Sequence, residues 1–70
     1  MKSRVITPLE KYRKLRGYTQ ADLSEMTSIS KVTISKWENS LEALRSGSSV
    51  RTKKVADALG ITIEKLLGED

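Results

Sequence analysis

The feature that most constrains this chain is a series of short apolar stripes at helical spacing, with no useful stretch in which polar and apolar residues alternate. The first stripe shows the pattern. Thr7-Pro8 suits the N-cap and the first position of a helix. Leu9, Tyr12 and Leu15 then form an apolar stripe, and a helix with this stripe would stop at Gly17.

Later segments begin in the same way. Thr19 opens a second helix, Ser30 caps a third helix at Lys31, and Thr62 caps the last one. Because helical spacing is the period present throughout, the sequence predicts an all-α fold, a compact bundle of four to five short helices. A chain of 70 residues has room for a single domain over residues 1–70.

Missing residue types exclude several kinds of chemistry. The chain has no Cys and no His, which excludes disulfides, Cys/His metal sites, and catalysis by a cysteine nucleophile or a histidine base. It has no glycine-rich phosphate loop, and its carboxylates show no pairing suited to acid–base catalysis. No long apolar run could span a membrane. We therefore expect a cytoplasmic protein that is not an enzyme and has no metal and no cofactor.

Charge is distributed in blocks. The net charge is +4 overall, but residues 1–16 carry +5, residues 17–30 carry −2, residues 31–54 carry +4 and residues 55–70 carry −3. Such blocks are either ordinary surface patterning or the sign of a basic face turned toward a polyanion.

The predicted third helix, Lys31 to Asn39, has two different faces. On a helical wheel, small, polar and cationic side chains fall on one side, and Ile34 and Trp37 fall on the other. Two residues break this division. Val32 is an apolar residue on the polar side, and Glu38 is an acid at the edge of the apolar side.

The polar face has the side-chain types that read base edges in a DNA major groove. Lys31 and Lys36 can donate to guanine O6 or N7, and Val32 can pack on a thymine methyl group. Ser35 can donate or accept. The alternative is a solvated polar surface with one exposed valine, and the wheel alone leaves both interpretations open.

From Thr19 to Asn39 the chain runs TQADLSEMTSISKVTISKWEN. This segment closely resembles the helix-turn-helix of the lambda-repressor and Cro family, often called the XRE family. LEKYRKLRGYTQ resembles the family's first helix and its link to the second, and VADALGITIEKLL resembles its fourth and fifth helices. The resemblance covers nearly all of residues 6–67. It implies a lambda-repressor-like DNA-binding domain with the helix-turn-helix unit at about residues 19–39.

The resemblance also implies a role for particular residues. Lys31, Val32 and Lys36 match positions that face base edges, and the wheel adds Ser35 to them. Arg13 matches an arginine that pairs with the glutamate at the position of Glu38, which would supply the cation that a packed acid needs. Positions near the DNA phosphates are matched by Thr19, Gln20, Ser30, Thr33 and Asn39, and we add Arg45 and Arg51 from the connection that follows.

The sequence departs from the family pattern in three places. Ser28 stands where the turn usually has glycine, and a left-handed backbone there would be strained. Ser24 stands where alanine usually packs, and its hydroxyl is expected to bond to the preceding helical turn. The connection over residues 40–48 is about three residues longer than usual. In this connection either the third helix runs on to about Arg45 or a separate turn forms.

The expected function is that of a transcriptional regulator of phage or plasmid type, a repressor or Cro-like protein, that binds a double-stranded DNA operator. The alternative is an antitoxin-type module whose main partner is another protein and which also binds its own operator, because both classes share the fold. One unit offers little DNA surface, so we expect a homodimer that reads two half-sites. Four apolar residues at the end of the chain are either its dimer contact or ordinary core: Ile61, Ile63, Leu66 and Leu67.

Overall fold

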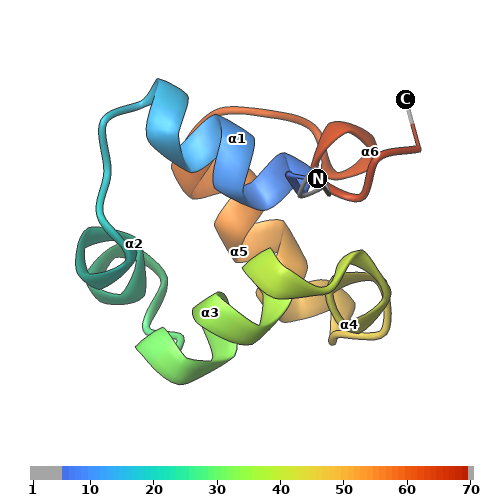
Figure 1. Cartoon of the computed structure of the whole chain (residues 1–70), viewed down its shortest axis with the longest axis horizontal. Helices are drawn as coiled ribbons and strands as arrows, with labels where there is room; N and C mark the ends of the chain where they lie inside the picture. Colours follow the sequence, from blue (N-terminus) through green and yellow to red (C-terminus); the bar gives the residue numbers. More distant parts are fainter. Residues whose placement is uncertain (1–5, 70) are drawn as a thin grey trace, which may run out of the picture.

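The computed structural model describes residues 6–69, which form six helices (Figure 1). In chain order these are α1 (Pro8–Leu15), α2 (Gln20–Thr27), α3 (Lys31–Asn39), α4 (Leu41–Arg45), α5 (Ser49–Leu59) and α6 (Ile63–Leu66). No strand occurs among the described residues, and the all-α prediction is confirmed. None of these helices combines the length and the apolar character that crossing a membrane requires.

Side-chain caps determine where the helices begin, as the sequence predicted. Thr7 caps α1, and its hydroxyl also donates to the carbonyl oxygen of Glu38 at 3.0 Å, which joins the start of α1 to the end of α3. Thr19 and Asp22 form a reciprocal capping box at α2, with N···O distances of 3.0 and 2.9 Å. Ser30 caps α3 by accepting from the backbone N–H of Thr33. The caps of α2 and α3 link residues three apart and fix the start of each helix. The bond from Thr7 to Glu38 instead holds two helices against each other.

The turn between α2 and α3 is closed by serine and threonine hydroxyls. Ser28 has φ 60° and ψ 25°, the left-handed conformation that favours glycine. The hydroxyl of Ser24 donates to the carbonyl oxygen of Ile29 at 2.6 Å, so the expectation that it bonds to the preceding helical turn was wrong. The chain doubles back after Ser28, and this brings the Ile29 carbonyl within reach of Ser24. Thr27 adds a bond from its hydroxyl to the carbonyl of Leu23, at 2.8 Å.

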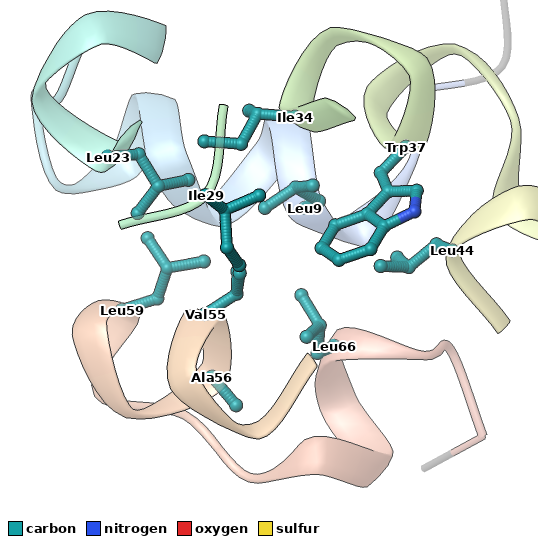
Figure 2. Close-up of a cluster of buried hydrophobic side chains, with 10 residues drawn as sticks. All are labelled: Leu9, Leu23, Ile29, Ile34, Trp37, Leu44, Val55, Ala56, Leu59 and Leu66. Atoms are coloured by element: carbon teal, nitrogen blue, oxygen red, sulfur yellow. The ribbon is translucent and has the colours of Figure 1, made fainter. Parts of the chain in front are cut away.

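The long connection after α3 contains a helix of its own. Ser40 is extended, with φ −149° and ψ 110°, and it ends α3 and caps α4 through a bond from the backbone N–H of Ala43. The third helix therefore does not continue to Arg45, and the bundle has one helix more than the largest number predicted. The extra residues place Leu44, which is fully buried, beside Trp37 in the core (Figure 2).

The core is one cluster to which all six helices contribute (Figure 2). In Figure 1, α5 crosses the middle of the molecule, with α1 and α6 on one side of it and α3 on the other. Leu15 was expected to add to the first apolar stripe, but it is exposed because it lies on a helix face turned away from this cluster. The buried apolar residues are Leu9, Leu23, Ile29, Ile34, Trp37, Leu44, Val55, Ala56, Leu59 and Leu66.

Candidate nucleic-acid interface

The outer face of α3 holds the four residues expected to read bases. Lys31 and Lys36 are exposed, and Ser35 is half-buried. Val32 is 79% exposed, a large fraction for an apolar side chain on a helix whose opposite face is in the core. Gln20, at the start of α2, joins Lys31, Val32 and Ser35 around a shallow hollow of about 300 Å³. An exposed apolar group between polar and cationic neighbours suits contact with a thymine methyl group beside base-edge acceptors.

A buried network fixes α3 against α1 and α2. The carboxylate of Glu38 accepts from Arg13 Nε at 2.5 Å and from Arg13 Nη2 at 3.1 Å. The side-chain amide of Gln20 donates to the same carboxylate at 3.0 Å, and Arg13 Nη1 donates to the carbonyl oxygen of Tyr18 at 2.8 Å. Glu38 is 3% exposed and Arg13 is 12% exposed. The hydrogen bond to Glu38 raises the pKa of Arg13, although desolvation opposes the shift, so the guanidinium keeps its charge.

This network defines what Arg13 and Gln20 can do. The guanidinium of Arg13 is committed to internal partners and is not available to DNA. Gln20 uses one amide N–H to hold Glu38, and its other N–H and its carbonyl oxygen are left for an external contact. Gln20 therefore braces α3 from the start of α2.

Four further candidates for phosphate contact, Thr19, Ser30, Thr33 and Asn39, lie at the ends of α2 and α3 or in the first turn of α3 and are engaged locally. Thr19 is occupied by the capping box of α2. The hydroxyl of Ser30 caps α3 and also lies 3.1 Å from the hydroxyl of Thr33. Asn39, exposed at the end of α3, donates its side-chain amide to the carbonyl oxygen of Ser35 at 2.9 Å. Thr19, Ser30 and Asn39 are exposed and Thr33 is half-buried, and each keeps hydrogen-bonding capacity for a ligand.

The last two phosphate candidates are separated by the fold. Arg51, in the first turn of α5, lines a hollow of about 340 Å³ together with Thr33 and Lys36 of α3. Arg45 does not line this hollow. Its Nε donates to the carbonyl oxygen of Leu67 at 2.9 Å, so its guanidinium lies against the end of α6.

Besides Arg13, two of the described positive charges near the amino end have partners within the fold. Arg16 Nε donates to the carbonyl oxygen of Leu59 at 2.8 Å, and Lys14 forms an ion pair with Glu10 at 2.9 Å. Lys2 and Arg4, which complete the basic block predicted over residues 1–16, lie outside the described residues. Among the described residues, Lys31, Lys36 and Arg51 of the second basic block, residues 31–54, lie on and beside the outer face of α3.

The four residues considered as a dimer contact differ in burial. Leu66 is 0% exposed and belongs to the core, so it cannot contribute to a surface contact, and its inclusion was wrong. Its side chain is covered because α6 packs directly on α5 and α1. Ile61 and Ile63 are half-buried and line a hollow of about 370 Å³ between α5 and α6, and Leu67 is half-buried against the core.

Sequence reasoning missed the hollow enclosed by α3, α4 and α5. It is lined by Thr33, Lys36, Trp37, Ala43, Ser46, Gly47, Ser48 and Arg51. A local signal was present in the sequence. Ser48 precedes a helix whose first turn contains no acid, and such a helix start leaves backbone N–H groups open to an anion.

Two helices joined by a tight turn, with the second presenting a polar and cationic face and held by a buried ion pair, define a helix-turn-helix DNA-binding domain. The comparison with protein families agrees: a family model described as helix-turn-helix matches residues 9–66, and the chain belongs to this family. It is a lambda-repressor/Cro-like domain, of a kind that binds DNA in a sequence-specific manner. Comparison with curated proteins and with solved structures returned no match.

Proposed function

We propose that this domain is a transcriptional regulator of phage or plasmid type that places α3 in the major groove of a double-stranded DNA operator. The observation that carries the proposal is the outer face of α3. This face presents two exposed lysines, Lys31 and Lys36, together with the exposed Val32. The major groove of DNA is wide enough to admit one α-helix such as α3.

The buried network supports this function because base reading needs a rigid helix. Glu38 is held by Arg13 from α1 and by Gln20 from α2, so the outer face of α3 keeps a fixed orientation. The same network neutralises Glu38, so this acid does not oppose the approach of the phosphate backbone.

The distribution of charge supports the same orientation. Lys31, Lys36 and Arg51 lie on and beside α3, whereas α6, which lies within the acidic block of residues 55–70, is across the molecule from α3 (Figure 1). The local positive potential at α3 is therefore higher than the net charge of +4 suggests.

A homodimer remains part of the proposal, with Ile61, Ile63 and Leu67 as its contact. These residues are half-buried in the single chain and could bury further apolar surface against a second copy. Two domains related by a two-fold axis would then read half-sites about one helical turn apart.

The experiment is a selection of bound sequences from random duplex DNA, combined with gel filtration of the selected complex. We expect an enriched half-site, repeated with two-fold symmetry, and an eluted complex with two copies of the chain. A pool that shows no enriched sequence, although the protein retains duplex, would reject sequence-specific regulation. Enrichment of a single half-site with one bound chain would reject the homodimer and keep the DNA-binding function.

A further inference from the structure

The hollow on the outer face of α3 combines one apolar side chain with groups that can donate and accept hydrogen bonds. It has a volume of about 300 Å³ and is lined by Gln20, Lys31, Val32 and Ser35. Val32 is 79% exposed, the highest value among the large apolar side chains that the structure describes. A single exposed valine is ordinary on a protein surface, and what sets this one apart is the set of groups around it.

The apolar wall of the hollow is rigid. Valine is branched at Cβ and has one strongly preferred rotamer in a helix, so its methyl groups point in a fixed direction from α3. Gln20 forms another part of the lining, and its amide donates to Glu38 at 3.0 Å, which holds the side chain in place. A rigid apolar wall can distinguish two ligands that differ by one methyl group.

The polar groups of the hollow do not select between donors and acceptors. The Ser35 hydroxyl can donate or accept, and none of the described residues bonds to it. Gln20 keeps one amide N–H and its carbonyl oxygen after its bond to Glu38. Lys31 can only donate, but it is exposed and pairs with none of the described residues, so its ammonium group is free to turn toward an acceptor on either base of a pair.

Pyrimidine bases present a matching pattern in the major groove. Thymine and 5-methylcytosine carry the same methyl group at C5, whereas uracil and cytosine carry none. Beside this methyl group thymine has an acceptor, O4, and 5-methylcytosine has a donor, the N4 amino group. The purine of either pair offers the acceptor N7 to Lys31. A site that relied on one directed hydrogen bond would separate the two methylated bases, whereas Val32 flanked by Ser35 and Gln20 suits both.

We propose that this hollow is a receptor for the 5-methyl group of a pyrimidine and accepts thymine and 5-methylcytosine alike, so that methylation of an operator cytosine regulates binding. The inference rests on the function proposed above and adds a chemical input to it. At the base pair that faces Val32, an unmethylated C·G pair makes a weak site. The same pair becomes a strong site when its cytosine is methylated.

The test scans the half-site found by selection, one base at a time, with the full chain. Affinities are measured by fluorescence anisotropy of labelled duplexes. Each thymine is replaced in turn by deoxyuridine, and each T·A pair by a C·G pair with or without a methyl group on the cytosine. We expect one position at which deoxyuridine lowers the affinity about fourfold per half-site, the effect of burying one methyl group. At that position, 5-methylcytosine should bind about fourfold more tightly than cytosine.

Variants assign the methyl effect to the hollow. Val32→Ala removes the apolar wall, and we expect the ratio of thymine to deoxyuridine affinity to fall from about four to about one. The matched control is Val50→Ala, which truncates another exposed valine that does not line this hollow, and its ratio should stay at about four. Both valines are on the surface, so both variants should keep the melting temperature of the native protein to within a few degrees.

The outcomes separate this inference from the function on which it rests. Absence of binding to every selected duplex rejects the proposed function. Binding with equal affinities for thymine and deoxyuridine at every position overturns this inference alone. A loss with deoxyuridine that is not matched by a gain with 5-methylcytosine indicates a reader of thymine O4 and overturns the proposed regulation. A ratio that Val32→Ala leaves unchanged overturns the assignment to this hollow.

Discussion

Glu38 gives the sharpest prediction for stability. It accepts three hydrogen bonds, two from Arg13 and one from Gln20, and it is 3% exposed. Glu38→Ala would leave the guanidinium of Arg13 largely buried without its counter-charge. Breaking a buried pair in this way costs about 3–5 kcal/mol. A domain of this length has a total stability of about 4–10 kcal/mol, so the variant would lose from about a third of it to all of it.

The assay is thermal and urea unfolding followed by far-ultraviolet circular dichroism. At about 4–8 °C per kcal/mol for a domain of this size, the midpoint should fall by about 12–40 °C. The matched control is Glu42→Ala, an exposed glutamate on α4, which should change the unfolding free energy by less than about 0.5 kcal/mol. The double variant Arg13→Met/Glu38→Leu removes both charges and should recover much of the loss.

Two outcomes would refute this reasoning. If Glu38→Ala melted within about 2 °C of the native protein, the pair would be solvated and would not hold α3 in place. If the double variant were no more stable than the single one, the loss would come from packing and not from an unpaired Arg13. Because the pKa of Arg13 is raised in the folded state, the stabilisation from its charge is complete below the ordinary pKa of arginine and is lost only as the pH rises above that value.

Three further predictions concern DNA binding and the turn. If one domain neutralises about four phosphates, log affinity should fall against log salt with a slope of about −3.6 per half-site, and a flat response would contradict phosphate contact. Lys36→Ala should relax base preference at one position by about 1–3 kcal/mol, whereas Gln20→Ala should weaken all duplexes alike; uniform losses from both across a sequence panel would reject the two roles. Ser28→Gly should raise the free energy of unfolding by about 0.5–1 kcal/mol in urea melts, because it relieves a left-handed serine, and a loss of stability would show that the hydroxyl matters more than the backbone.

Much of the candidate site could be predicted because its parts are set by short-range rules. Helix α3 begins after the Ser30 cap and ends at Ser40. A helical wheel of residues Lys31 to Asn39 already places the outer face on the opposite side from Trp37. The pairing of Arg13 with Glu38 could be expected from the family resemblance and from the need of a packed acid for a cation. None of these inferences required knowledge of how distant helices pack.

The errors have a common origin in tertiary packing. Leu66 and Leu15 both fit an apolar stripe, yet one is in the core and the other is exposed. Periodicity gives the direction of a side chain around its own helix, but it does not say whether another helix covers that direction. For the same reason, nothing local indicated that Arg45 would reach the end of α6.

By itself, the sequence determined an all-α domain with a helix-turn-helix at residues 19–39 and the polar face of the helix that begins at Lys31. Caps act over three residues and apolar stripes over one or two turns, so both can be read along the chain. Only the tertiary structure decided that residues 41–45 form a separate helix and that the Trp37 ring packs against Gly47. These outcomes depend on which side chains compete for the same buried volume, and that competition exists only after the helices have packed together.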